Sequence, residues 1–296
     1  MSAATTYKPN TLFDLSGRVA IVTGGGTGIG LKIASGFAAA GAKVYITGRR
    51  LEVLKKTASE WDRKIGGEII PLQMDVTDKK SIIAARDLVK EKEGKIHILV
   101  NNAGQVGPVS NFFNKTDSPE HKDVETLGQA LFDNEDMDGW KNLYQINVAA
   151  LFFVTTAFLG LLAKGSEDVK DFWSNVINIT SISGITSLAQ EHFCYNSSKA
   201  AATHITKMLA TEFALKGIAV RVNSIAPGVF ESEMTYGTIN GEEVDKIGKG
   251  IRPVPAKRPG SAEEMAGTAL YLASRAGGYT NGQEIVVDGG YLATNP

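Results

Sequence analysis

The amino-acid sequence predicts an α/β fold: one doubly wound parallel sheet in a single domain, with helices on both of its faces. Short runs rich in Val and Ile alternate with longer amphipathic segments along almost the whole chain. These runs are continuously apolar, as expected of strands buried on both faces. The first run also breaks directly into a glycine-rich turn that leads into a helix. No internal repeat, low-complexity tract or linker divides the 296 residues.

The strands and helices follow from the spacing of apolar side chains. We expect strands at residues 19–22, 43–47, 68–74, 97–100, 175–179, 219–225 and 284–288. Between them, helical spacing predicts helices at residues 31–38, 51–61, 79–92, 140–164, 195–216 and 262–274.

Three segments stand apart from this alternation. Residues 1–14 form a polar N-terminal extension to a domain that spans residues 15–296. Residues 105–139 carry eight acidic and two basic side chains with little periodicity, which favours a solvated insertion over a dedicated binding surface. Residues 230–258 are rich in Gly, Glu and Lys, and we expect a mobile flap on the substrate side.

Composition excludes several classes of protein. The formal net charge of −1 gives no electrostatic reason to expect a nucleic acid or an acidic membrane as partner. The single cysteine, Cys194, excludes an internal disulfide and fits a reducing compartment. It precedes Tyr195, but no His/Asp pattern accompanies it, so packing is a better interpretation than a nucleophile.

No segment of the sequence predicts secretion or a membrane span. Residues 1–15 lack an apolar run of signal-peptide length. The most membrane-like stretch, residues 146–163, is short and contains Asn147, Thr155 and Thr156, so we interpret it as a buried helix. We therefore expect a soluble, cytoplasmic protein.

The glycine-rich turn runs from Thr23 to Gly30, with the sequence Thr-Gly-Gly-Gly-Thr-Gly-Ile-Gly. Glycines let a backbone approach phosphates closely, and the start of the following helix offers free N–H groups and a partial positive charge. A dinucleotide pyrophosphate needs this arrangement. On its own, such a turn is also consistent with a tight connection.

Other polar and small residues follow strands too, at Arg49, Asp75 and residues 101–104. In doubly wound sheets, ligands bind beyond the carboxyl ends of the strands. The end of the second strand carries Arg49 and Arg50 and no carboxylate, which favours the 2′-phosphate of NADP(H) over the free ribose hydroxyls of NAD(H). The alternative is that both arginines only begin a solvated helix.

Tyr195 and Lys199 lie four residues apart on a predicted helix and therefore on one face. A phenol has a reference pKa of about 10, too high for ready proton transfer at neutral pH. A cation about 5 Å away is worth roughly 3 kcal/mol, and Lys199 could lower the pKa by about two units. Tyr195 could then exchange a proton with a carbonyl or alcohol oxygen, to which Ser181 could donate a second hydrogen bond.

Together these motifs resemble the short-chain dehydrogenase/reductase family in its single-domain, NAD(P)-dependent form. The resemblance runs from about residue 15 to residue 292 and implies a Rossmann-type fold. It rests on Thr23-Gly24-x-x-x-Gly28-Ile29-Gly30, Asn101-Asn102-Ala103-Gly104, Asn147, Ser181, Tyr195-x-x-x-Lys199 and Pro227-Gly228, which occur in the family's order.

The resemblance implies roles for four side chains. Tyr195 would be the catalytic acid/base, Lys199 would lower its pKa and hold the nicotinamide ribose, and Ser181 would position the substrate oxygen. Asn147 would support a water that relays protons to Lys199; alternatively it is a polar helix residue satisfied locally. Because the interval from Ser181 to Tyr195 is one residue longer than is common, Ser183 remains an alternative for the serine role.

Cofactor contacts are expected along the carboxyl ends of the strands, from the chemistry above and from the resemblance. Besides Tyr195 and Lys199, they comprise Gly24, Gly26, Thr27, Gly28, Ile29, Gly30, Arg49, Arg50, Asp75, Val76, Asn102, Ala103, Gly104, Pro227, Gly228, Val229 and Ser232. No metal-ligand cluster is visible in the sequence, and hydride transfer requires none.

These residues favour an NADPH-dependent reductase of ketones or aldehydes. The alternatives are an NAD-dependent alcohol dehydrogenase and a non-catalytic nucleotide-binding scaffold; the complete set of four catalytic residues speaks against the scaffold. A moderately apolar substrate is expected from the mostly uncharged residues near the cleft, which are Ser183, Ile185, Gln190, His192, Phe193 and Phe230.

The helices at residues 140–164 and 195–216 are rich in small and apolar side chains. The corresponding helices of relatives commonly form a subunit interface, so the resemblance implies a homodimer or homotetramer.

Overall fold

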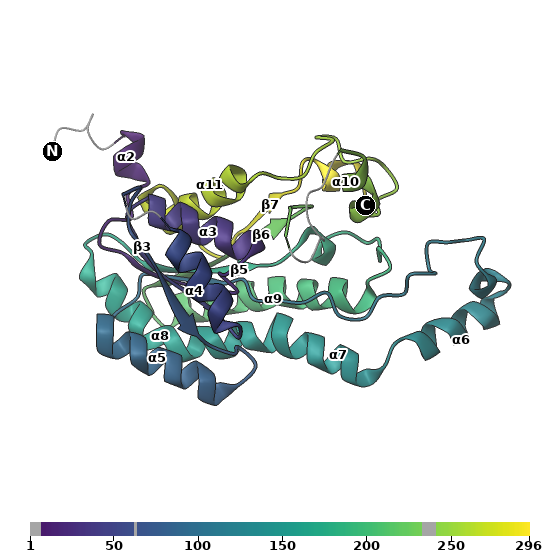
Figure 1. The fold of residues 1–296 in the computed structure, drawn as a ribbon, viewed down its shortest axis with the longest axis horizontal. Helices are drawn as coiled ribbons and strands as arrows, with labels where there is room; N and C mark the ends of the chain where they lie inside the picture. Colours follow the sequence, from purple (N-terminus) through teal and green to yellow (C-terminus); the bar gives the residue numbers. More distant parts are fainter. Residues whose placement is uncertain (1–6, 62–63, 233–240) are drawn as a thin grey trace.

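The sheet has seven strands, all paired in parallel, in the order β3-β2-β1-β4-β5-β6-β7 (Figure 1). The computed structural model describes residues 7–61, 64–232 and 241–296. The strands are β1 (Val19–Thr23), β2 (Lys43–Gly48), β3 (Glu68–Gln73), β4 (Ile98–Asn101), β5 (Ser174–Ile179), β6 (Val220–Pro227) and β7 (Glu284–Val287). The order reverses between β1 and β4, and this switch point is where open α/β sheets bind their ligands.

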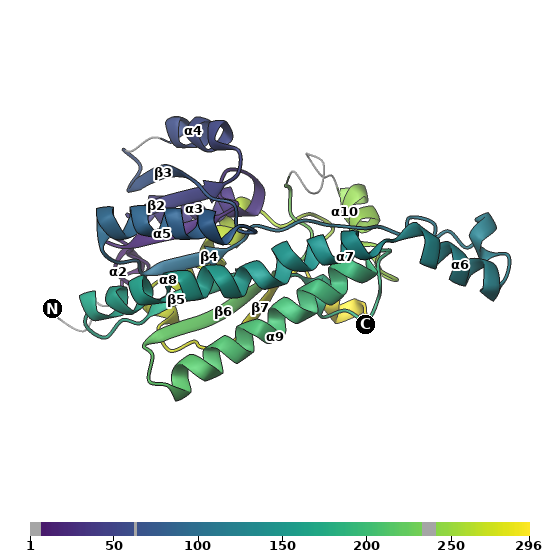
Figure 2. The same ribbon diagram turned by 90° about the horizontal axis from the view of Figure 1, so that it is seen from below.

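Helices cover both faces of the sheet, and each face has its own core (Figure 2). One core contains side chains of α3 (Gly28–Ala39), α4 (Leu51–Glu60) and α11 (Ala262–Ala273). The other contains side chains of α5 (Lys79–Glu93), α8 (Ala150–Asp168) and α9 (Phe193–Leu215). The predicted doubly wound α/β fold is confirmed, and each predicted strand lies within two residues of its observed ends.

The long helix predicted at residues 140–164 is divided. It consists of α7 (Met137–Tyr144), a π-helical turn (Gln145–Ala149) and α8. A π-turn inserts one extra residue into a helix. The helix axis continues, but the side chains after the turn point in directions rotated about that axis. The whole stretch is long and apolar enough to cross a membrane, but half of its most apolar window is buried, as in a core helix.

The insertion at residues 105–139 has more structure than its composition predicts. It contains a 3₁₀ turn (Pro119–His121) and the amphipathic helix α6 (Val124–Asn134), which Asp123 caps by accepting a hydrogen bond from Thr126 N. Both views show this segment projecting away from the body of the molecule (Figures 1 and 2).

Short helices complete the chain. They are α2 (Pro9–Leu12), α10 (Gly241–Gly248) and α12 (Tyr291–Thr294). Part of the predicted flap, residues 233–240, lies outside the described residues, and α10 lies in the part of the flap that follows.

A buried polar network ties the sheet to the helices beneath it. The Asn101 amide donates to Asn178 Oδ1 at 2.8 Å and to Thr155 Oγ1 at 3.0 Å. Asn178 in turn donates to Thr206 Oγ1 at 2.8 Å. Buried polar groups are costly unless they are paired, so this network holds β4, β5, α8 and α9 in fixed positions relative to one another.

A second buried polar group lies just before β4. The His97 side chain is fully buried; its Nδ1 accepts from Val19 N at 3.0 Å and its Nε2 lies 3.2 Å from Asp168 Oδ2. Burial lowers the pKa of His97, and the Asp168 hydrogen bond offsets this only in part. The imidazole is therefore neutral in the folded chain at neutral pH.

We expect His97 to make the fold less stable in mild acid. The unfolded chain binds a proton near pH 6.5, whereas the folded chain binds it only at lower pH, so stability is lost as the pH falls below about 6.5. Thermal melts between pH 7.5 and pH 5.5 measure this loss. His97→Asn retains an acceptor for Val19 N but does not titrate, and its melting temperature should vary less with pH. An identical pH dependence in both proteins would contradict the assignment.

Candidate active site

The glycine-rich turn forms an open backbone cradle at the start of α3. Gly24 and Gly28 have φ values of +63° and +54°, which L side chains rarely adopt. A Cβ on Gly30 would clash with the carbonyl oxygen of Gly24 and with the Asn102 amide. The first amides of α3 have no partner within the helix, so this cradle fits a pyrophosphate.

A set of hydrogen bonds between the ends of β1 and β4 holds the cradle in place. Thr23 Oγ1 donates to Val100 O and accepts from the amides of Asn102 and Ala103, at 2.9 and 3.0 Å. The Asn102 side chain donates to the carbonyl oxygens of Thr23 and Gly24, at 2.9 and 3.1 Å. Sequence reasoning did not count Thr23 as a site residue, although its place before the first glycine was a usable signal.

The ends of β2 and β3 present both signs of charge. Arg49 and Arg50 are exposed directly after β2. Asp75 is half-buried and accepts from the backbone and hydroxyl of Thr77, at 2.9 and 2.7 Å. Burial acts against ionisation of Asp75, but the Thr77 hydrogen bonds and the Arg49 charge lower its pKa, so it is ionised.

The other predicted cofactor positions lie along the same edge. Val76 is buried after β3, and Ala103 and Gly104 follow β4. Pro227 ends β6, the Gly228 amide donates to Val287 O, and Val229 O accepts from Gly260 N, each bond being 2.9 Å long. The structure thus brings together, at the carboxyl ends of the strands, the segments predicted to bind the dinucleotide.

Lys199 is a buried cation on α9, in the same helical segment as Tyr195. Its Nζ donates to Ile179 O at 2.9 Å and lies 5.6 Å from the centroid of the Tyr195 ring. Burial lowers the pKa of Lys199 to about 8. The ammonium form still dominates at neutral pH and places one positive charge beside the phenol.

The expected lowering of the Tyr195 pKa by Lys199 is not what the geometry produces. Burial raises the pKa of Tyr195, and a hydrogen bond with the Ser181 hydroxyl opposes that rise only in part. Removing the phenol from water disfavours the phenolate more than that hydrogen bond favours it. At neutral pH Tyr195 is therefore a protonated donor.

Ser181 is the serine that faces Tyr195. It caps the 3₁₀ turn Ile182–Gly184, and its Oγ accepts from Ser183 N at 3.1 Å. The alternative, Ser183, instead donates its hydroxyl to Gln190 Oε1 at 2.9 Å. Despite the longer interval before Tyr195, it is Ser181 that shares a hydrogen bond with the phenol.

Asn147 lies in the π-helical turn and is 2% exposed. Its amide exchanges two 3.0 Å hydrogen bonds with the backbone of Gln105, and it also donates to Ser198 Oγ at 3.1 Å. These partners are 42 and 51 residues away in the sequence, so the side chain is not satisfied locally. Asn147 thereby fixes the chain directly after Gly104. A Cβ added to Gly104 would lie 3.0 Å from Asn147 Oδ1 and 3.8 Å from Lys199 Nζ.

Two of the expected substrate-side residues are structural instead. Gln190 is buried, and its amide donates to Gly248 O at 2.6 Å and to the Tyr291 hydroxyl at 2.9 Å. Phe230 is 3% exposed and packs in the core that contains α3 and α11. Spacing alone could not distinguish these anchors from residues that line a cleft.

Among the remaining expected substrate-side residues, only His192 has a ring contact with Tyr195 among the described residues. The His192 ring lies edge-on to Tyr195, with centroids 6.3 Å apart, and Phe193 packs edge-on against Phe113 at 5.0 Å. Ile185 is 42% exposed. None of these three side chains is charged at neutral pH, since burial lowers the pKa of His192.

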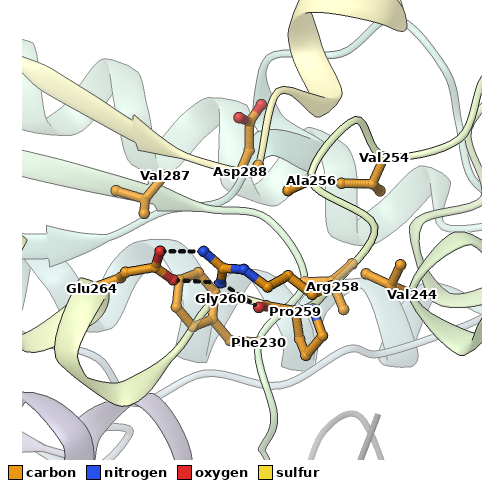
Figure 3. Close-up of a pocket in the computed structure, with 12 residues that line it drawn as sticks. Phe230, Val244, Val254, Ala256, Arg258, Pro259, Gly260, Glu264, Val287 and Asp288 are labelled. Carbon is orange, nitrogen blue, oxygen red and sulfur yellow. Dashed lines mark hydrogen bonds and ion pairs between the residues drawn. The ribbon is translucent and has the colours of Figure 1, made fainter. Parts of the chain in front are cut away.

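A small pocket lies behind Phe230, between β7, α10 and the segment before α11 (Figure 3). Its one close ion pair joins the Arg258 guanidinium to both carboxylate oxygens of Glu264, at 2.9 and 2.6 Å, and lowers the pKa of Glu264 to about 2. Glu264 also caps α11 through Ser261, and Asp288 accepts from the backbone of Gly290. The charged side chains that line this pocket already take part in an ion pair or in capping hydrogen bonds, so we assign them no role in catalysis.

Sequence reasoning also missed Glu284, at the start of β7. Its Oε1 accepts from the hydroxyls of Thr180 and Thr203, both at 2.7 Å. Thr180 precedes Ser181 and Thr203 lies one helical turn after Lys199, so this carboxylate joins the two segments that carry Ser181 and Lys199. The only sequence signal was an acidic residue beginning an otherwise apolar strand.

Thr23→Val should weaken both the fold and the cradle. It leaves the amides of Asn102 and Ala103 without an acceptor, at a cost of roughly 2–4 kcal/mol. We expect a lower melting temperature and a lower affinity for a nicotinamide dinucleotide, measured by calorimetry. Thr23→Ser keeps the hydroxyl and should restore both. Unchanged affinity in the valine variant would show that the cradle does not depend on this hydroxyl.

Comparison with known proteins agrees with this geometry. A family model described as enoyl-(acyl carrier protein) reductase matches residues 24–292. The short-chain dehydrogenase/reductase PhomF of Diaporthe leptostromiformis is 39% identical over 289 residues, covering 96% of this chain and 94% of PhomF.

Solved structures show the same fold. The RhlG/NADP active-site complex of Pseudomonas aeruginosa has a TM-score of 0.76 and 31% identity, covering 95% of this chain and 98% of RhlG. A 7α-hydroxysteroid dehydrogenase complexed with NADH and 7-oxo glycochenodeoxycholic acid has a TM-score of 0.77 and 29% identity. The match covers 96% of this chain and 98% of the dehydrogenase. The chain belongs to the short-chain dehydrogenase/reductase family of oxidoreductases, whose members bind a nicotinamide cofactor.

Proposed function

We propose that this protein is an NADPH-dependent reductase of ketones or aldehydes. The observation that carries the cofactor choice is the end of β2, where Arg49 and Arg50 are exposed and the turn before α4 holds no carboxylate. Guanidinium groups pair with a phosphate dianion, whereas a carboxylate at this position would accept from ribose hydroxyls and repel the phosphate. Among the similar structures, one is an NADP complex and another an NADH complex, so this choice rests on the chain's own residues.

The state of Tyr195 supports reduction over oxidation. Burial raises its pKa, so at neutral pH the phenol holds a proton that it can donate to a developing alkoxide. Ser181 shares a hydrogen bond with the same hydroxyl and can donate to the same oxygen. Lys199 holds a positive charge nearby, which stabilises the phenolate that is left once the proton has been donated. A bound nicotinamide dinucleotide supplies the hydride.

The surroundings of Tyr195 favour a moderately apolar substrate. His192, whose pKa burial lowers, is neutral at pH 7, and Phe193 and Ile185 add apolar surface. The ion pair of Glu191 with Lys249 neutralises the charges next to His192. A strongly anionic substrate would find no unpaired cation among these groups.

We also propose that the chain associates through α8 and α9. These two helices expose four large apolar side chains, Phe152 (45%), Phe153 (37%), Met208 (52%) and Leu215 (76%), which a subunit interface would cover. A twofold arrangement lets the same face cover itself. No nucleic acid or membrane is needed as a partner, and we place the protein in the cytoplasm.

The cofactor proposal is tested by the ratio of kcat/KM for NADPH to kcat/KM for NADH. A charge-assisted hydrogen bond contributes about 1.5–3 kcal/mol, so Arg49→Ala should weaken the use of NADPH roughly ten- to a hundredfold and leave NADH almost unchanged. Arg49→Asp should reverse the preference, because it repels the phosphate and accepts from ribose hydroxyls. Arg50→Ala reports whether the second arginine shares the contact.

A wild-type protein that prefers NADH would overturn the cofactor proposal and favour the NAD-dependent alcohol dehydrogenase. A preference for NADPH that neither alanine variant reduces would place the selectivity elsewhere, with Thr27 as the next position to replace. Lys55→Ala on α4 is a matched control, since it removes an exposed cation already paired with Glu52.

A further inference from the structure

The most distinctive part of the molecule is the projecting segment at residues 105–139, called the arm below. Its base is anchored: Ser110 N donates to Glu191 O at 2.9 Å, and Glu135 accepts from the Ser110 hydroxyl and from Trp140 Nε1, both at 2.7 Å. Beyond this base the arm extends away from the body in both views (Figures 1 and 2). The arm is therefore held in a set direction while its outer part lies clear of its own chain.

The outer part of the arm exposes large apolar side chains, which an amphipathic helix normally packs against other parts of a protein. α6 has no buried residue, although its sequence is amphipathic. Val124 is 88% exposed, Phe132 81% and Met137 87%. A helix of eleven residues is marginal in water without tertiary packing, so these side chains require a partner surface.

Charge indicates what kind of surface that is. The arm has eight acidic and two basic residues and so carries a charge of −6, which leaves +5 on the rest of a chain whose net charge is −1. The body of another copy is thus opposite in sign to the arm. The same acidity disfavours an anionic membrane as the occupant.

The long helix shows where the arm of one copy would meet another. The helical stretch Met137–Asp168 has 32 residues, and its midpoint lies between Phe152 and Phe153. These two exposed rings pack edge-on at 5.5 Å. A twofold axis at this midpoint would pair the helices antiparallel and bring the Met137 end of one copy beside the Asp168 end of the other.

The surface at the Asp168 end suits the arm. Trp173 follows α8 and is 47% exposed, which is unusual for so large an apolar side chain. Lys164 and Lys170 are exposed here, and so are Glu167 and Asp171, while Asp168 pairs with Lys95. This end therefore offers an exposed apolar side chain among charges of both signs.

We propose that the arm docks on a second copy of this chain, with Val124, Phe132 and Met137 covering the region of Trp173 on that copy. This proposal rests on the association through α8 and α9 and goes beyond it, because it assigns the arm a partner and a place. Since the base of the arm contacts Glu191 and Phe193 beside the active site, the docked arm also joins each site to the neighbouring subunit.

A photocrosslink tests the contact directly. The native Cys194 is buried and its pKa is raised to about 11, so a maleimide benzophenone attaches selectively to the variant Phe132→Cys. Labelled chains are mixed with ¹⁵N-enriched wild-type chains and irradiated, and crosslinked peptides are identified by mass. We expect crosslinks between unlike chains, to peptides within residues 164–173. Crosslinks confined to one chain, or to another region of the second copy, would overturn the proposal.

Sedimentation measures how much the arm contributes. Val124→Asp and Phe132→Asp should each raise the dimer dissociation constant at least tenfold, because a charge is then buried against the second copy. Tyr279→Asp, at an exposed aromatic of the body, is the matched control and should leave the constant unchanged. A monomeric wild type, or arm variants with the wild-type constant, would refute the docking.

Activity separates this proposal from the proposed reaction. At protein concentrations far above the dissociation constant, the arm variants should keep the wild-type kcat with NADPH. A protein that dimerises through the arm but reduces no carbonyl substrate would contradict the reaction and leave the docking supported.

Discussion

The hydrogen bonds between the ends of β1 and β4 are the interaction on which the site depends. Thr23 Oγ1 accepts two amides from the chain after β4, and the Asn102 amide returns two bonds to Thr23 and Gly24. They lie where the strand order reverses, so the helices on the two sides diverge and leave room for a ligand. The glycine cradle and the segment that carries Asn102 consequently face one another with little freedom.

The fold could be predicted because its strands are buried on both faces. Runs such as residues 19–22 are apolar throughout and are followed by glycine or polar residues, so the ends of these strands can be located from the sequence alone. The π-turn at Gln145–Ala149 and the helix α6 were not predicted. The first contains Asn147, whose partner Gln105 lies 42 residues away in the sequence, and the second lies in a segment whose acidity resembles that of a solvated loop.

The sequence predicted which residues lie in the candidate site better than it predicted their burial and their pKa values. Tyr195, Lys199 and Ser181 come together as their spacing indicated. Gln190 and Phe230, expected beside substrate, are anchors in the interior, since burial depends on neighbours distant in sequence. The pKa of Tyr195 is raised for the same reason, because desolvation is a property of the packed fold and not of the four-residue spacing.

The central claim is that this chain transfers a hydride to a carbonyl carbon while Tyr195 provides the proton. Its most direct test uses NADPH carrying deuterium at the transferring carbon, with a panel of apolar ketones and aldehydes, and mass analysis of the alcohol. We expect one deuterium on the carbinol carbon with wild-type protein, and at least a hundredfold slower labelling with Tyr195→Phe. Unlabelled alcohol, or equal labelling by the phenylalanine variant, would contradict it.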